Sequence, residues 1–173
     1  IAVQRNSTLS VDDAVTPNIT ETTRLDAASD GRLVVDSDFD KGEFDTIQAA
    51  VNAASAGDTI EVATGTFTNS VTIDQPNLTL EGPNAGTPGA SAERGAEAVI
   101  TGQVIVEADT VVVDGLTVSP SDPGDDTTRS EAIRVSNSAD NVVIQNNIVR
   151  DFARNSGSKD VFFGVDGINI FGG

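Results

Sequence analysis

The sequence predicts an all-β fold in which short parallel strands stack as a solenoid, with one short α-helix near its N-terminal end. Short strand patterns repeat along the chain at offsets of about thirty residues. Turn residues and polar loops of different length separate these patterns. A single helical pattern precedes most of them, where a helix can cover the open end of such a stack.

The helix is predicted over residues 45–54. Asp45 is a good N-cap, and Gln48 three residues later completes a capping-box pattern. Gly57 is expected to end the helix. Apolar residues recur at i, i+3, i+4 and i+7, which places them on one face: Ile47, Ala50, Val51 and Ala54.

Three short strands are predicted between this helix and Gly82, because the apolar period changes from helical spacing to two. The residues expected to point into the core are Ile60, Val62, Val71, Ile73, Leu78 and Leu80. A polar Gly/Pro/Ala loop follows over residues 83–95.

The later strands repeat the earlier ones. One set of superposable segments is 77–82, 110–115 and 141–146, and a second is 70–73, 103–106, 131–135 and 166–170. Asn146 and Asn147 are expected at a turn, where Asn tolerates left-handed backbone and hydrogen-bonds along the stack. A β-sandwich is the alternative, but it needs Asn-Gly-type hairpin turns, which this chain lacks.

The segment FDTIQAAVNAASAGDTIEVATGTF, followed by VTI and LTLEG, resembles the start of right-handed parallel β-helix proteins of the pectin lyase-like group, in particular the opening of pectin methylesterases. The resemblance extends over residues 44–82. It implies a right-handed parallel β-helix over residues 31–173. It implies no activity, because the catalytic residues of that family lie in later coils.

The composition restricts both the environment and the chemistry. Twenty-seven acidic residues against ten basic ones give a net charge of −17, which predicts repulsion of nucleic acid and of anionic membranes. Adaptation to high salt, as in haloarchaeal proteins, is one interpretation, and an ordinary acidic protein is the other. Without Cys or His, the chain has no thiol nucleophile, imidazole zinc site or Ser-His-Asp triad.

Residues 1–30 are polar and weakly patterned, so we expect an extended or flexible arm. The first residue is not Met, which suggests a processed product or an excised piece of a secreted or cell-surface protein. No run of residues is apolar enough to insert into a membrane. Three glycosylation sequons begin at Asn6, Asn18 and Asn77.

A weak calcium-binding pattern precedes the helix. Asp36, Asp38 and Asp40 alternate, and Gly42 follows, as in loops that surround calcium with oxygen ligands. The Gly is one residue late and no Glu stands at the expected spacing for a bidentate ligand, so a solvated acidic turn is the alternative.

Two late segments suggest catalysis. DVFFG at 160–164 resembles the DFIFG segment of pectin methylesterases, which implies Asp160 as a nucleophile, although the other motifs of that family are absent. VDGI at 165–168 resembles the NTDG segment of polygalacturonases, which implies a role for Asp166. Surface Asp residues in solenoid turns are the alternative for both. A lyase would need calcium and a base such as Arg134, Arg150 or Arg154.

The sequence therefore favours an extracellular, salt-adapted β-helix domain that acts as a surface scaffold, a self-assembling subunit or a glycan-contacting module. The alternative is the N-terminal part of a polysaccharide-active enzyme, esterase-like or glycosidase-like. The last segment, FFGVDGINIFGG, is apolar and has no cap, so either the natural protein continues or another chain covers this edge. In the second case, the arm of one copy would cover the last coil of the next copy, head to tail.

Overall fold

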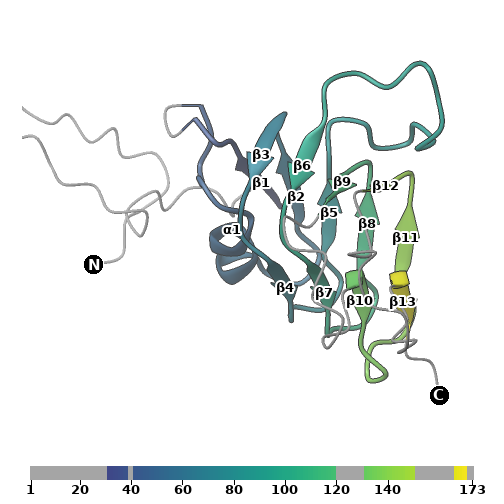
Figure 1. Ribbon diagram of the computed structural model, residues 1–173. Coiled ribbons are helices and arrows are strands. Elements are labelled where there is room, and N and C mark those ends of the chain that lie inside the picture. The colour runs from purple at the N-terminus through teal and green to yellow at the C-terminus, as the bar shows by residue number, and fades with distance from the viewer. Residues whose placement is uncertain (1–30, 39–40, 120–130, 151–165, 171–173) are drawn as a thin grey trace, which may run out of the picture.

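The computed structural model describes residues 31–38, 41–119, 131–150 and 166–170, which form a parallel β-solenoid with one short helix (Figure 1). The predicted arm, residues 1–30, lies outside these ranges. In the described ranges, no helix is long and apolar enough to cross a membrane. The elements, in chain order, are β1 (Arg32–Val35), α1 (Ile47–Ala53), β2 (Thr59–Val62), β3 (Gly65–Phe67), β4 (Val71–Ile73), β5 (Thr79–Glu81), β6 (Ala98–Ile100), β7 (Val104–Val106), β8 (Val112–Asp114), β9 (Thr117–Val118), β10 (Glu131–Val135), β11 (Val143–Gln145), β12 (Ile148–Val149) and β13 (Asp166–Ile170).

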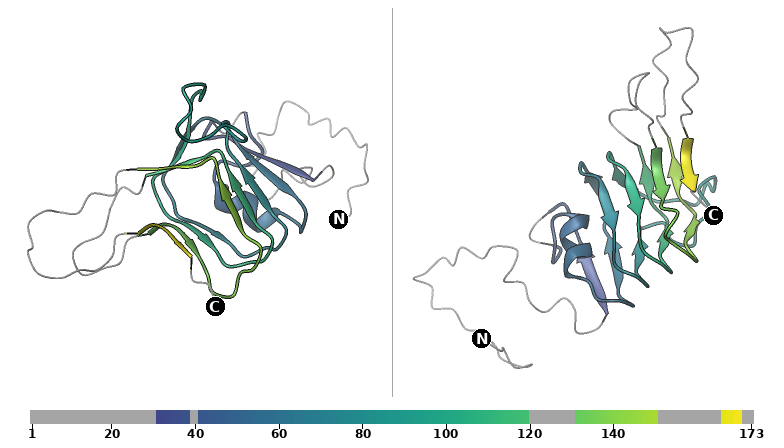
Figure 2. Two further views of the ribbon diagram at one scale, coloured as in Figure 1. Left: turned by 90° about the vertical axis from the view of Figure 1, so that its right-hand side faces the viewer. Right: turned by 90° about the horizontal axis from the view of Figure 1, so that it is seen from below.

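The strands form three parallel sheets that run along the stack. Sheet A has the order β1-β2-β5-β8-β11, sheet B has β12-β9-β6-β3, and sheet C has β13-β10-β7-β4. Neighbours within a sheet come from successive coils, so the backbone hydrogen bonds run along the solenoid axis (Figure 2). The all-β solenoid predicted from the sequence is confirmed.

The register confirms both predicted sets of repeats. In sheet A, Leu80 pairs with Val113, which in turn pairs with Ile144. In sheet C, Val106 lies between Ile73 and Val135. Equivalent residues of successive coils therefore stack directly on one another and form continuous apolar files.

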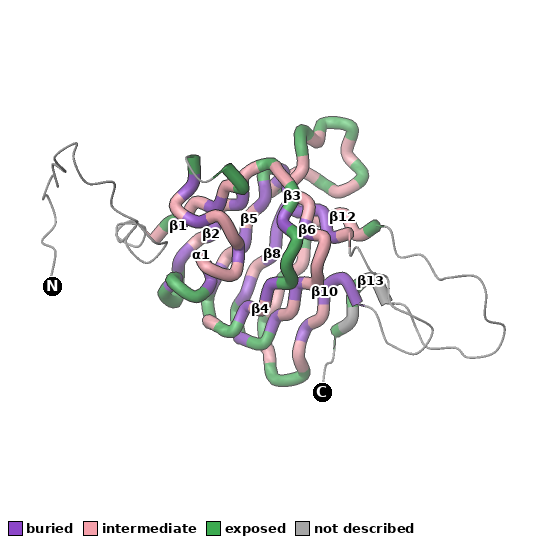
Figure 3. Tube along the Cα trace, turned by 60° about the vertical axis from the view of Figure 1, so that its left-hand side comes forward, coloured by how far each residue is buried: buried purple, intermediate pink, exposed green. Residues whose placement is uncertain are grey.

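These files form the core. Along strands such as β2, β4 and β7, buried and partly exposed residues alternate, as expected when one face of a sheet points inward (Figure 3). All six core residues predicted between the helix and Gly82 are buried: Ile60, Val62, Val71, Ile73, Leu78 and Leu80. Burial of each such side chain stabilises the fold by about 1.5–3 kcal/mol.

The helix is shorter than predicted, and its cap is a different residue. Thr46, not Asp45, is the N-cap: its backbone is extended and its hydroxyl accepts a hydrogen bond from Ala49 N. The C-cap is Ala54, so the helix ends before Gly57. The prediction of a capping box at Asp45 and Gln48 was therefore wrong, because Thr46 is the cap and the side chain of Gln48 is hydrogen-bonded to Thr72 of β4 instead.

One strand was not predicted from the sequence. The segment Gly65–Phe67 forms β3, the edge strand of sheet B. Only Phe67 in this segment is buried, so it carries almost no alternating pattern. Its strand geometry comes from pairing with β6.

A column of left-handed residues forms the turns before sheet A. Asn77, Thr110 and Asn141 occupy equivalent positions in successive coils, and their φ angles are 59°, 58° and 58°. Asn146, with φ 54°, and Asn147 lie at the opposite turn, as predicted. There they stack on Gly115 and Leu116 of the preceding coil, so they do not extend an Asn ladder.

Candidate interaction sites at the ends of the solenoid

A parallel solenoid leaves unpaired backbone groups only where a sheet ends. The edge strands at the N-terminal end are β1, β3 and β4, and those at the C-terminal end are β11, β12 and β13. Unpaired N–H and C=O groups at such edges can pair with a strand of another chain. Contacts with a partner chain are therefore expected at the two ends.

A side chain of α1 covers the edge of β4. Thr72 N donates to Gln48 Oε1 at 2.8 Å, and Gln48 Nε2 donates to Thr72 O at 3.1 Å. The amide of Gln48 thus makes both hydrogen bonds that a neighbouring strand would make. Asn52 Oδ1 accepts from the same Nε2 at 3.0 Å and helps to fix its orientation.

The edge of β1 is covered in a similar way by the segment before the helix. Val34 N donates to Glu43 Oε2 at 2.9 Å. Val34 O accepts from Glu43 N at 2.9 Å and from Phe44 N at 3.1 Å. The carboxylate and backbone of Glu43 therefore take the place of a further strand.

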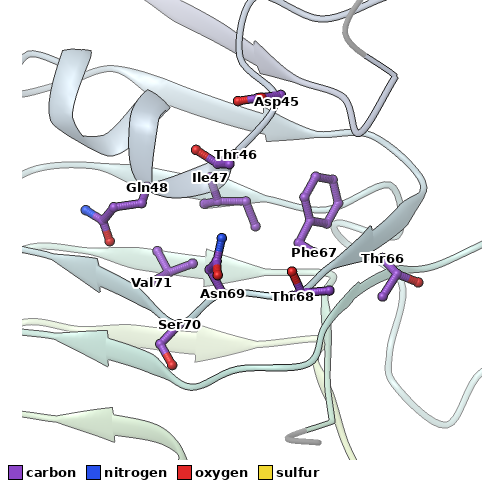
Figure 4. Close-up of a pocket in the computed structure, with 10 residues that line it drawn as sticks. All are labelled: Asp45, Thr46, Ile47, Gln48, Thr66, Phe67, Thr68, Asn69, Ser70 and Val71. Atoms are coloured by element: carbon purple, nitrogen blue, oxygen red, sulfur yellow. The ribbon is translucent and has the colours of Figure 1, made fainter.

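At β3, a Cβ atom on Gly65 would lie 2.8 Å from Ser37 Oγ, so Ser37 lies against one end of this strand, and a small cleft lies nearby. The cleft has a volume of about 100 Å³ and lies between the start of α1 and the β3–β4 corner (Figure 4). Ile47, Phe67 and Val71 contribute apolar surface to it. Asp45 also lines it, and its Oδ1 atom is buried with no hydrogen-bond partner among the described residues. A buried carboxylate oxygen without a partner is costly and needs an explanation.

The C-terminal end lacks such a cover in the described part of the chain. In sheet C, Ile133 is fully buried, whereas Ile168, which stacks on it, is 45% exposed. Likewise, Val135 is 2% exposed and Ile170 is 66% exposed. In sheet A, Ile144 is only partly buried, although Val113 and Leu80 before it in the same file are buried. The apolar files thus continue to this end and stop there uncovered.

The outer face of sheet A carries more charged residues than the edge strands at the C-terminal end. On sheet A, Glu61, Glu81 and Asp114 are adjacent in one outward file, so like charges stack at about the interstrand spacing of ~4.8 Å. Arg32 pairs with Glu61, and Asp114 accepts hydrogen bonds from neighbouring amides. By contrast, the sequences of two edge strands at this end, β11 and β12, contain no charged residue, and the third, β13, contains only Asp166.

A buried ion pair fixes the loop between β5 and β6, and the sequence analysis missed it. Arg94, with a side chain only 5% exposed, donates to Glu97 through Nε at 2.8 Å and through Nη2 at 2.9 Å. Its Nη1 donates to Thr87 O and Asn146 O, both at 2.7 Å, so it joins this loop to a later coil. The hydrogen bonds from Arg94 lower the pKa of Glu97, and burial only partly offsets them. The signal in the sequence was an Arg and a Glu three residues apart in an otherwise small-residue loop.

The same loop packs against a turn that only glycine can form. Gly115 has φ +74°, and a Cβ atom there would lie 2.1 Å from Ala85 N. The residue must therefore be glycine both for its backbone conformation and for the close approach of the loop.

The predicted calcium ligands are only partly described. Asp36 Oδ1 accepts from Asp38 N at 2.8 Å, and Asp38 pairs with Lys41 at 2.6 Å. Asp40 lies outside the described residues. Within the described ranges, no three acidic, His or Cys side chains form a group that could hold a metal ion.

Some of the candidate catalytic and glycosylation residues lie within the described ranges, and others lie outside them. Asp160, Asn6 and Asn18 lie outside the described residues. Asp166 begins β13, beside Glu131 of β10 in the register. Asn77 is exposed at the left-handed turn before β5, where a sequon would be accessible.

Comparison with known proteins does not assign the chain to a family. No family model, no curated protein and no solved structure matches it.

Proposed function

We propose that this chain is a scaffold or assembly module of a secreted or cell-surface protein, adapted to high salt, and that a further polypeptide segment covers its last coil. The observation that carries it is the exposure of Ile168 and Ile170, at 45% and 66%, in files that are buried in the preceding coils. We also propose that the chain is related to the pectin lyase-like group. Its acidic surface would then be of the kind found in haloarchaeal proteins.

Two physical arguments favour a covered end. Burying one large aliphatic side chain contributes about 1.5–3 kcal/mol. A segment that covers the last coil would therefore gain this free energy for each exposed aliphatic side chain that it buries. Proteins also protect free strand edges with charges, bulges or helices. Of the three edge strands at this end, β11 and β12 carry no charge and β13 carries one, Asp166.

The segment we propose as the cover is the arm, residues 1–30, of a neighbouring copy. Within it, Ser7 to Val11 places two apolar residues, Leu9 and Val11, two positions apart, as on one face of a pairing strand. Thirty residues can span up to about 100 Å, whereas the four strand spacings from β1 to β11 amount to only about 19 Å. The arm is therefore long enough to reach an adjacent molecule, and such a contact is head to tail.

The experiment compares the particle mass of the full chain with that of a chain lacking Ile1–Asp30, by light scattering in molar KCl. We expect assemblies from the full chain and monomers after the deletion. The matched variants are Leu9→Asp with Val11→Asp, which should also prevent assembly, and Thr8→Asp with Ser10→Asp, which add the same charge on the opposite face and should not. A monomeric full chain, or assemblies that survive the deletion, would contradict the proposal.

Contact with a glycan and catalysis on a polysaccharide have less support. Only Phe could supply an aromatic sugar platform, and the two of the seven Phe residues that lie in the described ranges, Phe44 and Phe67, are both buried. Asp160 lies outside the described residues, and Asp166 is placed only by its backbone.

A further inference from the structure

We infer that the loop between β5 and β6, residues 83–97, is a clamp that holds the last described coil of sheets A and B in place, and that Arg94 fastens this clamp. The coil consists of β11, β12 and the turn at Asn146 and Asn147 between them. All the contacts that form the clamp lie within one molecule. The inference is therefore separate from the proposal that a neighbouring copy covers the end of the solenoid.

The first step is that apolar burial holds this coil less firmly than it holds the coil before it. In the preceding coil, Val113 and Val118 are fully buried. In the last coil, Ile144 stacks on Val113 and Val149 stacks on Val118, but both are only partly buried. Local stability decreases with the apolar contacts that a segment makes. We therefore expect β11 and β12 to open before the inner strands unless other contacts hold them.

The second step is that the loop contacts the turn of this coil at two places. Arg94 Nη1 donates to Asn146 O at 2.7 Å. Five residues earlier, a Cβ atom on Gly89 would lie 2.7 Å from Asn147 O and 3.5 Å from Ile148 Cγ1, so the loop backbone lies directly against the start of β12. The loop leaves β5 and thus reaches past the intervening coil to the last one (Figure 1).

The third step is that the side chain of Arg94 is itself held firmly. Its Nε and Nη2 donate to the two carboxylate oxygens of Glu97 at 2.8 and 2.9 Å, and Thr117 Oγ1 donates to the same carboxylate at 3.1 Å. Thr87 O accepts a further hydrogen bond from Nη1. The side chain of Arg94 is only 5% exposed, so water competes little for these bonds. A charged donor in such a place makes a stronger hydrogen bond to Asn146 O than a neutral donor would.

Other polar contacts limit how much depends on the clamp. Asn147 Nδ2 donates to Val113 O, and Asn147 Oδ1 accepts from Leu116 N. Asn146 Nδ2 donates to Asp114 Oδ1. These bonds join the turn to the preceding coil alone, whereas Arg94 joins it to the loop. Loss of Arg94 should therefore make the last coil open more often without unfolding the whole solenoid.

The test measures amide hydrogen exchange in the full chain in molar KCl, at a dilution at which light scattering gives the monomer mass. The Val143 and Ile148 amides report on the last coil, and the Thr79 amide, at the start of β5, reports on an inner strand. In Arg94→Gln, we expect the protection of the first two to fall about ten- to a hundredfold relative to that of Thr79. The ratio cancels any loss of global stability, because complete unfolding exposes all three amides alike.

Gly89→Ala tests the second contact and leaves the ion pair intact. Its Cβ atom would press on Asn147 O, so we expect the same selective loss of protection. Gly95→Ala is the matched control in the same loop, because its Cβ atom would meet its nearest neighbour at an ordinary 3.9 Å. Arg134→Gln is the control for the lost charge, since Arg134 lies on β10 with a side chain that is 37% exposed. Both controls should keep the ratios of the parent protein.

A folded Arg94→Gln or Gly89→Ala protein that shows no selective loss would overturn the inference. An equally selective loss in Gly95→Ala or Arg134→Gln would also overturn it, because the effect would then not come from the contacts with Asn146 and Asn147. If Arg94→Gln does not fold, Gly89→Ala decides the question by itself.

Discussion

Thr110 is the least favourable residue in the column of left-handed turns, so replacing it with Asn should stabilise the protein. Its φ is 58°, a conformation that is a genuine outlier for a β-branched residue. The equivalent residues in the coils before and after it, Asn77 and Asn141, have the same backbone conformation and are of the type that tolerates it. Thr110 is exposed, so the substitution removes no core packing.

The expected gain follows from the backbone alone. A left-handed conformation costs an ordinary residue about 1–2 kcal/mol, and Asn recovers part of this through local hydrogen bonding. We therefore expect Thr110→Asn to raise the free energy of unfolding by about 1 kcal/mol and the melting temperature by about 2–4 °C. Thr110→Gly should gain less, because glycine also raises the entropy of the unfolded chain.

Circular dichroism in molar KCl is the suitable assay, since the chain has no Trp or Tyr for fluorescence. Thr68→Asn is the matched control: Thr68 is exposed, and its φ is not in the left-handed region. We expect a change within about 0.5 kcal/mol for this surface substitution. If Thr110→Asn gains no more than Thr68→Asn, the strain attributed to the turn is wrong.

Three further predictions test the charge, the loop and its ion pair. The net charge of −17 and the stacked carboxylates of sheet A predict a melting temperature that rises steeply from low salt to molar KCl, and a flat profile would refute this. Gly115→Ala should destabilise by about 2–4 kcal/mol in denaturant titrations, and Gly86→Ala, with φ +73° but open space around it, by only about 1 kcal/mol. Equal losses would exclude the contact with Ala85 as the cause. The lowered pKa of Glu97 stabilises the fold above the ordinary value of 4.5, and this contribution disappears as the pH falls through the folded-state pKa. Glu97→Gln should therefore flatten the acid side of the stability profile, which an unchanged profile would contradict.

The sequence by itself was sufficient for the fold and its register. The repeats in the sequence align Leu80, Val113 and Ile144, because every coil must place an apolar residue at the same point of the stack. The same periodicity identified the core around Val71 and Ile73. It failed at β3, where one buried residue is too few to show a period.

The roles of individual polar residues were decided only by the tertiary structure. Asp45 and Gln48 formed a plausible capping box, yet Gln48 pairs with the edge of β4, 24 residues away along the chain, and Asp45 lies in a cleft. Arg94 gave no sign that it reaches Asn146 in a later coil. Apolar periodicity is a local property that each coil repeats, whereas a hydrogen bond across coils depends on which residues the stacking brings together. For that reason, the sequence determined the solenoid, and the three-dimensional structure determined how its ends and loops are fixed.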